Sequence, residues 1–355
     1  MSSGVSKPVI AIIVIVIIGV AGFGAWYLIT SAPQLPENPY DVAIVFATGG
    51  RGDKSFNDAA YKGATDANTT LGMNFAFAEP NAIADYEGAI RDFARHANYR
   101  DPYKLIISIG FDQADAVMKI ANESPSQRFA IVDMFINPGV YPNVTSLLFK
   151  AHEGSALVGA MAGLMTQTNK TGFVGGMDID LINNFAAGYI WGVNHANPSV
   201  NVTRAYVGGW ADIPTGLSLA NGMYSSGIDI IFAAAGRSGL GVLDAAKATN
   251  GTKAYPVWGI GVDSPQMYYG TNATNGRSVV LTSMLKRVDV AVYRQFEAIK
   301  TGTWSGTVIN GGLAEGLVGY ELNATLVELP TSVISYLYAL ETAIIAGTYV
   351  VPDHL

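Results

Sequence analysis

Apolar runs short enough for buried strands alternate along the chain with longer segments whose apolar residues recur at helical spacing. Up to Pro142, this pattern predicts strands at Val42–Ala47, Met73–Ala78, Leu105–Ile109 and Phe129–Val132. Between these strands it predicts helices over residues 61–71, 84–97 and 114–121. Strands that alternate with helices form a parallel sheet with helices on both faces, so we expect an α/β fold.

The alternation restarts after Pro142, which indicates a second α/β unit of similar length. Its predicted strands are Val144–Phe149, Thr171–Gly175, Asn201–Val207, Ile228–Ala234 and Val257–Gly261. Helices are predicted over 153–165, 183–195 and 213–225, with a further helix starting at Leu240. Two α/β units of similar length in tandem predict two Rossmann-like lobes with a cleft between them. The units show no recognisable sequence repeat.

The last part of the chain contributes segments to both lobes. Its pattern predicts strands over 278–285 and 316–322 and helices over 288–301 and 332–346. We expect the chain to cross between the lobes near residues 147–150, 282–285 and 308–312. The N-terminal lobe would then comprise 41–147 with 285–308, and the C-terminal lobe 148–284 with 309–355. Three crossings would form a hinge that leaves the lobes free only to open and close.

An uncharged, apolar run of 21 residues, Val9–Ile29, lies near the start of the chain. A helix of that length crosses a hydrocarbon core of about 30 Å, whereas the apolar part of a signal peptide usually has about 7–15 residues. Small residues at 25, 31 and 32 leave late cleavage open as the alternative. Lys7 precedes the run and Glu37 is the next charge, so we predict a cytoplasmic segment 1–8, a transmembrane anchor 9–29, a proline-rich spacer 30–40 and an extracellular remainder.

Composition narrows the possible functions. The net charge is −7 and only 14% of the residues are charged, which argues against nucleic acid as a partner. There is no cysteine, so disulfides, thiolate metal sites, cysteine nucleophiles and a lipidated cysteine are excluded. The four histidines have no metal-ligand spacing, and no serine nucleophile motif is present. We therefore predict no catalytic residues, no metal and no cofactor.

Acceptor sequences for N-glycosylation are more frequent than chance, which would give about 3. There are eight: Asn68, Asn122, Asn143, Asn169, Asn201, Asn250, Asn272 and Asn323. Two interpretations stay open. One is a polar surface of low charge that happens to be rich in Asn and Thr. The other is an exported glycoprotein on a cell that covers its surface with N-glycans.

Polar residues gather where predicted strands end, and the densest group lies in the stretch 41–63. There a strand leads into a glycine-rich turn and then into Asp53, Phe56 and Asn57 at the start of a helix. Asp133 and Asp263 similarly follow strands of the two halves. In an open α/β sheet, ligands bind beyond the carboxyl ends of the strands. These ends therefore predict a binding site between the lobes.

Seven segments resemble, in order and spacing, the basic membrane protein family. They are GGRGDKSFNDAAYKG, FAIVD, FKAHEGSALVGAMAGL, TGFVGGMD, GWADIPTG, GVDSPQ and VVLTSMLKRVDVAVY, and together they extend from about Asp41 to Tyr320. Members of this family are substrate-binding proteins of ABC importers related to purine-nucleoside receptors. The resemblance implies a type I periplasmic-binding fold that closes on its ligand and delivers it to a permease with its ATPase.

The chain departs from the bacterial members of the family in its anchor. They carry a lipidated cysteine after the signal peptide, and this sequence has no cysteine. A transmembrane helix would replace the lipid, as on an archaeal-type cell surface.

The resemblance also implies roles for individual residues, with a nucleoside as the ligand. We expect Asp53 and Asn57 to bind the edge of the base, and Asp133 and Asp263 to bind the ribose hydroxyls. Lys286 would bond the sugar and balance the carboxylates. Buried carboxylates that accept hydroxyl protons discriminate against analogues without them, because an unpaired buried acceptor costs about 1–3 kcal/mol.

Aromatic and small residues complete the predicted site. Stacking on an aromatic ring contributes about 1–3 kcal/mol per base. The candidates to flank the base are Phe56, Tyr61, Met134 and Trp210, and Gly236 would let the backbone approach the ligand closely.

Each of these residues also has a purely structural interpretation. Asp53 would be a helix cap, Phe56 and Tyr61 would be core, the strand-end aspartates would form turns, and Lys286 would be a solvated helix start. Three other functions stay open as well: a ligand-sensing ectodomain, a receptor for a sugar or another small polar ring, and an extracellular nucleoside hydrolase. The hydrolase would need clustered acidic metal ligands, whereas these aspartates are spread over both predicted lobes.

Overall fold

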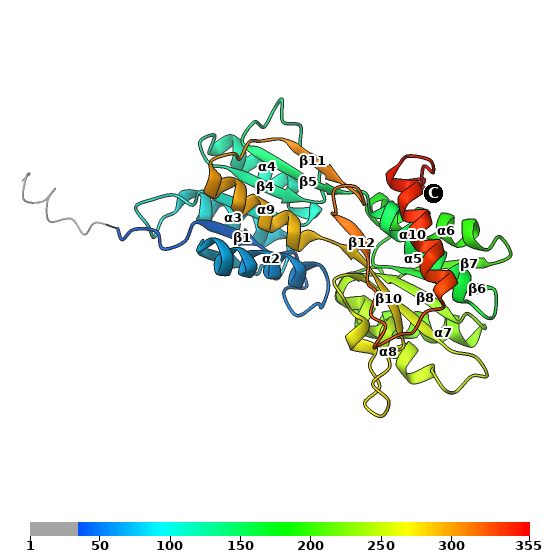
Figure 1. The fold of residues 1–355 in the computed structure, drawn as a ribbon. Helices are drawn as coiled ribbons and strands as arrows, with labels where there is room; N and C mark the ends of the chain where they lie inside the picture. The colour runs from blue at the N-terminus through cyan, green and yellow to red at the C-terminus, as the bar shows by residue number, and fades with distance from the viewer. Residues whose placement is uncertain (1–34) are drawn as a thin grey trace, which may run out of the picture.

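The computed structural model describes residues 35–355 (Figure 1). The predicted cytoplasmic segment 1–8, the predicted anchor 9–29 and residues 30–34 of the predicted spacer lie outside the described residues. Within 35–355, no helix is both long enough and apolar enough to cross a bilayer.

Two six-stranded sheets form the framework. The first has the order β11-β5-β4-β3-β1-β2, and the second has the order β12-β10-β9-β8-β6-β7. The strands of the first sheet are β1 (Val42–Val45), β2 (Phe75–Ala78), β3 (Leu105–Ile109), β4 (Phe129–Val132), β5 (Val144–Phe149) and β11 (Val308–Gly311). Those of the second are β6 (Lys170–Gly175), β7 (Asn201–Tyr206), β8 (Ile230–Ala234), β9 (Trp258–Asp263), β10 (Val280–Lys286) and β12 (Val318–Tyr320). Neighbouring strands are parallel, except that β12 runs antiparallel to β10.

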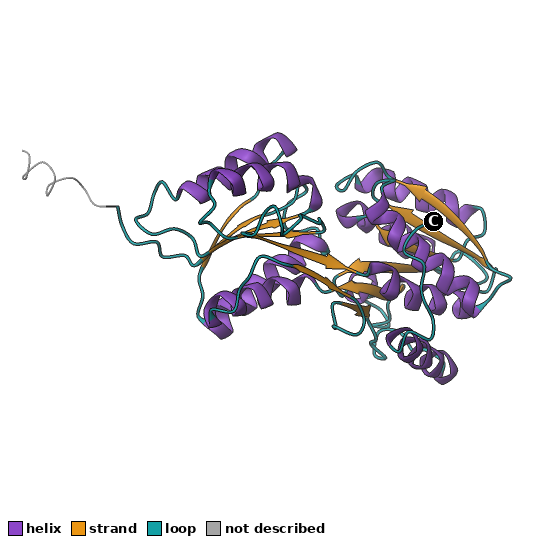
Figure 2. Cartoon of the chain, turned by 90° about the horizontal axis from the view of Figure 1, so that it is seen from above, coloured by secondary structure: helices purple, strands orange, loops and turns teal. Residues whose placement is uncertain are grey.

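Helices cover both faces of each sheet (Figure 2). The first lobe has α2 (Phe56–Leu71), α3 (Tyr86–Arg95), α4 (Ala114–Glu123) and α9 (Val288–Thr301). The second has α5 (Ala151–Met165), α6 (Asp180–Ala196), α7 (Ile213–Ser225), α8 (Gly239–Thr249) and α10 (Thr331–Ile345). The short 3₁₀ turns η1 (Ile83–Asp85), η2 (Phe111–Gln113) and η3 (Gly236–Ser238) precede α3, α4 and α8. A fourth, η4 (Met267–Gly270), lies between β9 and β10.

The central strands are apolar on both faces because both faces are covered. In β1, Val42 and Ile44 belong to the core under α2 and α9, while Ala43 and Val45 belong to the core under α3 and α4. The second sheet repeats this division between the α5, α6 and α10 side and the α7 and α8 side. The run VAIV is therefore a strand buried on both faces. The predicted two-lobed α/β fold is confirmed.

The chain passes between the lobes three times. It leaves the first sheet after Phe149, returns to the first lobe after Lys286, and passes back to the second sheet after Gly311. Helix α9 accordingly packs on α2 although it follows a strand of the second sheet. Figure 1 shows the described N-terminal end on the first lobe and the C-terminus on the second.

Helix α2 begins at Phe56, five residues before the predicted start at Tyr61. The reason is the carboxylate of Asp53, which accepts hydrogen bonds from the backbone N–H groups of Ser55, Asn57 and Asp58 at 2.8–3.1 Å. The first N–H groups of a helix have no partner within the helix, and an aspartate just before it satisfies them. This turn carries Phe56 and Asn57 to the carboxyl edge of the first sheet.

Candidate ligand-binding cleft

A cavity between the lobes is lined by residues that follow strands of both sheets. The first lobe contributes Thr48, Asp53, Phe56, Asn57, Asp112 and Asp133, and the second contributes Leu181, Ile182, Phe185, Trp210, Arg237, Asp263 and Lys286, among others. Its empty space is about 710 Å³, counting solvent at the mouth. The cavity therefore lies where this fold binds its ligands, beyond the carboxyl ends of the strands.

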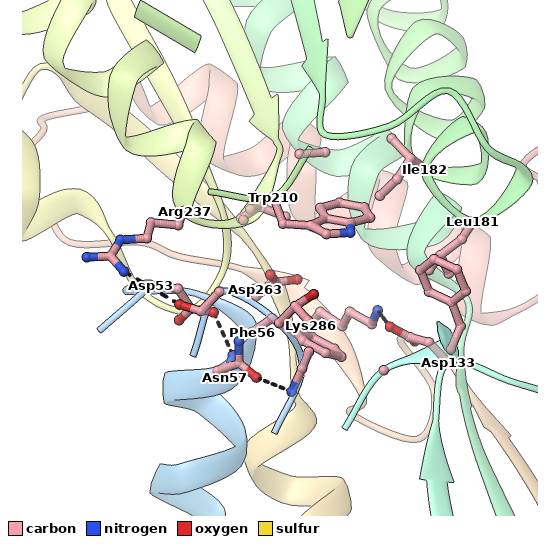
Figure 3. A pocket seen from close by; sticks show the side chains of 18 of the residues that line it. Asp53, Phe56, Asn57, Asp133, Leu181, Ile182, Trp210, Arg237, Asp263 and Lys286 are labelled. Atoms are coloured by element: carbon pink, nitrogen blue, oxygen red, sulfur yellow. Dashed lines mark hydrogen bonds and ion pairs between the residues drawn. The ribbon is translucent and has the colours of Figure 1, made fainter. Parts of the chain in front are cut away.

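Lys286 forms the polar centre of the cavity. Its ammonium lies 2.5 Å from an oxygen of Asp133, and it is only 3% exposed. The rings of Phe56 and Phe149 are 5.1 Å from the Nζ atom, and the ring of Phe185 is 5.6 Å away. Aromatic faces within about 6 Å attract a cation. A carboxylate and three rings therefore hold the ammonium in place, as Figure 3 shows for the pair with Asp133.

Asp133 and Asp263 occupy matching places in the two lobes. Asp133 directly follows β4 and Asp263 ends β9, and β4 and β9 have the same position in their sheets. Both residues have a positive φ, 67° and 63° respectively. This left-handed conformation costs most L-residues about 1–2 kcal/mol, although aspartate tolerates it better than most. The strand ends therefore turn sharply at two acidic residues that both line the cavity.

Asp263 is the carboxyl group most strongly affected by burial. Burial raises its pKa to about 6 from an ordinary value of 3.8, while the charge of Lys286 and a hydrogen bond from Ser55 oppose the rise. The Ser55 hydroxyl donates to Asp263 at 2.5 Å. Burial also raises the pKa of Asp53, against the hydrogen bonds from the first backbone amides of α2. A bound hydroxyl or N–H donor would stabilise either carboxylate in its charged form.

An aromatic wall faces this polar centre. Trp210 packs so closely on Gly176 that a Cβ there would lie 2.4 Å from the indole ring, and Gly236 lies beside the same residue. In Figure 3 the Trp210 ring lies across the cavity from Phe56 and Lys286. The space between therefore has an apolar face on each side and charged groups at its edge.

Hydrogen bonds join the lobes along one side of the cavity. The Ser264 hydroxyl donates to the Ser55 carbonyl at 2.9 Å, and the side-chain amide of Gln266 donates to the Lys54 carbonyl at 2.8 Å. The bond between Ser55 and Asp263 belongs to the same group. The loop before α2 is therefore held on the second lobe.

Eight of the ten residues predicted for the site line the cavity: Asp53, Phe56, Asn57, Asp133, Trp210, Gly236, Asp263 and Lys286. The structure also decides between their alternative interpretations. Asp53 does cap a helix while lining the cavity, and Lys286 is buried rather than solvated. Their contacts with a ligand stay predictions.

Tyr61 and Met134 do not line the cavity, so the prediction that they flank the base is corrected. Because α2 begins at Phe56, Tyr61 lies more than a turn along the helix, where its ring packs on Phe75 and Phe77 and under the Arg51 guanidinium. Met134 packs against the core under α3 and α4. Neither residue enters the proposals below.

The lining residues that were not predicted from the sequence include Asp112, Phe185 and Arg237. Asp112 follows the strand β3 closely, just as Asp133 follows β4. The strand-end rule that found Asp133 would therefore have found it. Phe185 lies in an apolar helix with no local sign of a role, because only the contact between the lobes brings it to the cavity.

Seven of the eight glycosylation acceptors are exposed, and Asn143 is the exception. Its side-chain amide donates to the carbonyls of Ala121, Ser124 and Gln127 at 3.0–3.3 Å. A glycan on this nitrogen would remove these bonds. Asn143 therefore has a structural role, while modification of the other seven stays a prediction.

Two α/β lobes with a cavity between them define a solute-binding protein, and the comparisons with known proteins agree. A family model described as "ABC transporter substrate-binding protein PnrA-like" matches residues 40–354. The CD4+ T-cell-stimulating antigen of Listeria monocytogenes is 39% identical over 292 residues, 79% of each chain. The ABC transporter nucleoside-binding protein BmpA of Lactococcus lactis is 34% identical over 321 residues, 88% of each chain.

A solved structure supports the same assignment. A solute-binding protein of an ABC transporter system from Aeropyrum pernix superposes with a TM-score of 0.77 at 28% identity, covering 88% of this chain and 94% of that one. The chain therefore belongs to the basic membrane protein family of PnrA-like ABC transporter substrate-binding proteins. Such a protein binds a small molecule for a permease and its ATPase. A relative from Pyrococcus horikoshii, 32% identical over 79% of this chain and 68% of the relative, is described as a lipoprotein.

Proposed function

We propose that the cavity binds a nucleoside, preferably a purine nucleoside, and that the lobes close on it before delivery to the permease. The arrangement at Lys286 carries this proposal. It places one ammonium and the carboxylates of Asp133 and Asp263 beside the facing rings of Phe56 and Trp210. A nucleoside needs both parts, because its ribose is rich in hydroxyls and its base is flat.

The two carboxylates and the ammonium are suited to the ribose. Lys286 is already bonded to Asp133 and has two further N–H donors, while Asp263 accepts only from Ser55 within the described residues. Vicinal hydroxyls would donate to Asp133 and Asp263 and accept from Lys286. Hydrogen bonds to charged groups contribute about 1.5–3 kcal/mol each, so these contacts would account for much of the affinity.

The rings of Phe56 and Trp210 would stack on the base, and Asn57 would bind its edge. The Asn57 side-chain oxygen accepts from the Ala47 N–H at 3.0 Å, which orients the amide and leaves its NH₂ group for a ligand. The carboxylate of Asp53 already accepts three backbone hydrogen bonds. Its contribution to the base edge would therefore be smaller than that of Asn57.

The three chain crossings would act as the hinge. A ligand shifts the lobes toward closure only if it binds the closed arrangement more tightly than the open one. Contacts from both lobes to the same ribose provide that difference, because Asp133 belongs to the first lobe and Asp263 to the second. The bonds between Ser55 and the second lobe would guide the motion.

We also propose that residues 9–29 anchor the chain with its N-terminus in the cytoplasm, the binding domain outside, and glycans on exposed acceptors. The absence of cysteine supports a protein anchor rather than a lipid. Protease digestion of intact cells should remove the domain and leave residues 1–8 protected. Glycopeptide mass spectrometry of the native protein should detect sugars on exposed acceptors and none on Asn143.

Isothermal titration of the purified full chain tests the ligand. We expect guanosine, inosine and adenosine to bind at least tenfold more tightly than ribose or the free bases, because neither part alone fills both halves of the site. Equal affinity for ribose would instead make the protein a sugar receptor. Release of free base from inosine would overturn the receptor assignment in favour of a hydrolase. Lys286→Met should abolish binding, whereas Lys247→Met, on the exposed face of α8, should not.

A further inference from the structure

Asp112 is a residue of the cavity with one side-chain oxygen that has no hydrogen-bond partner within the described residues. It lies on the 3₁₀ turn η2 that follows β3, and it lines the cavity. Its Oδ2 atom accepts a hydrogen bond from the Tyr86 hydroxyl at 3.0 Å, and that hydroxyl accepts from the Thr48 N–H at 2.7 Å. Its Oδ1 atom is buried and has no hydrogen-bond partner within the described residues.

Such an oxygen needs an explanation. Nearly all buried polar atoms in native proteins have a partner, and leaving one unpaired costs its full desolvation penalty. Burial correspondingly raises the pKa of Asp112, while the Tyr86 hydroxyl favours its charged form. Because this oxygen belongs to a residue of the binding cavity, we expect its partner to arrive with the ligand.

The backbone at Gly110 fixes where this oxygen lies. Gly110 has a φ of 118°, and a Cβ at that position would be 2.9 Å from the Asp112 Oδ1 atom and 4.0 Å from the Phe56 ring. A glycine is therefore needed to leave space for the oxygen. The same geometry places Gly110 beside both this oxygen and the edge of the Phe56 ring, on which the base is proposed to stack.

We propose that Asp112 is a specificity-determining residue that accepts a hydrogen bond from an N–H group on the edge of the base, and that it favours guanine. This proposal rests on the proposed nucleoside binding. An ionised carboxylate can only accept hydrogen bonds. Guanine presents two adjacent donors, its ring N1–H and its amino group, whereas hypoxanthine presents only the ring N–H and unsubstituted purine presents neither.

A residue of the second lobe is a second possible partner for Asp112. The turn η3 corresponds to η2, and its Arg237 occupies the place that Asp112 has in η2. Arg237 is exposed, and its guanidinium donates to the Gly49 carbonyl at 3.5 Å. The other possible partner for Asp112 is therefore Arg237 after closure, and the experiment must distinguish the two.

Titration of the full chain with guanosine, inosine and purine riboside tests the proposal. We expect wild-type protein to prefer guanosine to purine riboside by about 10- to 100-fold, the usual value of a hydrogen bond to a charged acceptor. Asp112→Asn should remove most of that preference by weakening guanosine while leaving purine riboside within about twofold. The matched control is Asp115→Asn, an exposed aspartate one helical turn away, which should change neither affinity.

Several outcomes would overturn the proposal. If Asp112→Asn weakens both ligands equally, Asp112 only supports the loop or pairs with Arg237, and Arg237→Met should then reproduce the effect. Wild-type protein that binds guanosine and purine riboside equally well would refute the role of Asp112 without any variant, so the test does not depend on the folding of the variant. If no nucleoside binds the wild type, the underlying function fails instead.

Discussion

The two lobes share one strand order but present different chemistry to the cavity between them. Their sheets differ in strand direction only at the edge, where β12 is antiparallel to β10 and β11 is parallel to β5. Both place an aspartate with positive φ at the end of the same strand. Beside these aspartates, the first lobe contributes polar groups such as Asn57 and Asp112 together with the ring of Phe56. The second contributes an aromatic wall that includes Trp210, together with the basic residues Arg237 and Lys286.

This difference shows which positions of such a fold can vary in sequence. The buried strands must be apolar on both faces, so their order and composition are constrained in both lobes. The loops beyond their carboxyl ends carry no such constraint, and there the lobes differ. Asp112 and Arg237 occupy corresponding turns with opposite charges. Two lobes with the same strand order can therefore present different side chains to one cavity.

The lobes also differ in how their helices pack beneath the cavity. In the second lobe α5 and α6 meet backbone to backbone: a Cβ at Gly159, Gly188 or Gly192 would lie 2.0–2.2 Å from a carbonyl oxygen of the other helix. In the first lobe the corresponding pair, α2 and α9, has one such contact, at Gly63. The second lobe is therefore the more tightly packed of the two at this layer.

The largest expected effect comes from breaking the ion pair between Lys286 of the second lobe and Asp133 of the first. Lys286→Met leaves Asp133 buried without its counter-charge, and removing one partner of a buried ion pair costs about 3–5 kcal/mol. Chemical denaturation should show this loss relative to Lys247→Met. A variant as stable as the wild type would show that Lys286 serves the ligand only, not the junction between the lobes.

Glycine substitutions compare the packing of the helices. Gly192→Ala forces α5 and α6 apart, and overpacking of this kind costs about 1–3 kcal/mol. The control, Gly222→Ala, lies within α7 with nothing near its Cβ position and should stabilise the protein by about 0.4–1 kcal/mol. If Gly192→Ala were neutral or stabilising by thermal unfolding, the proposed difference between the lobes would disappear.

Substitutions in the cavity test the division between affinity and specificity. Trp210→Ala should lower the affinity for every nucleoside by about 1–3 kcal/mol, since stacking does not depend on the identity of the base. Asn57→Ala should instead change the ranking of bases. Calorimetric titration with a set of nucleosides measures both. A change in ranking from Trp210→Ala would contradict the assignment of Trp210 to stacking alone.

The pH dependence of binding should be the smallest effect. Asp263 has a pKa of about 6, and the ribose hydroxyls are expected to donate to its ionised form. Affinity should be constant above pH 6 and fall about tenfold for each unit below it. Asp263→Asn should bind weakly at every pH and show no such slope, which separates Asp263 from Asp53 and Asp112.

The same group affects stability in the opposite direction. The folded pKa of Asp263 is above its ordinary value of 3.8, so the folded state holds this proton more tightly than the unfolded state. The contribution of Asp263 to the free energy of unfolding should therefore decrease as pH rises from about 4 to about 6, then stay constant. Denaturation of wild type and Asp263→Asn across this range measures the difference.

The sequence alone predicted most of the framework and much of the site. Alternating runs located nearly every strand, and the rule that ligands lie beyond strand ends identified Asp133 and Asp263. These predictions succeeded because both features are local in the chain: a strand buried on both faces, and the residue that ends it. Helix starts were less certain: the capping by Asp53 moved the start of α2 to Phe56 and carried Tyr61 away from the cavity.

What only the tertiary structure decided is which distant groups meet. Lys286 lies 153 positions from Asp133 in the chain, and their contact depends on two sheets and the crossings between them. The place of Phe185 in the cavity likewise depends on how the lobes face each other. Periodicity is set by neighbours along the chain, whereas a site shared by two lobes is set by packing between segments that no local pattern relates.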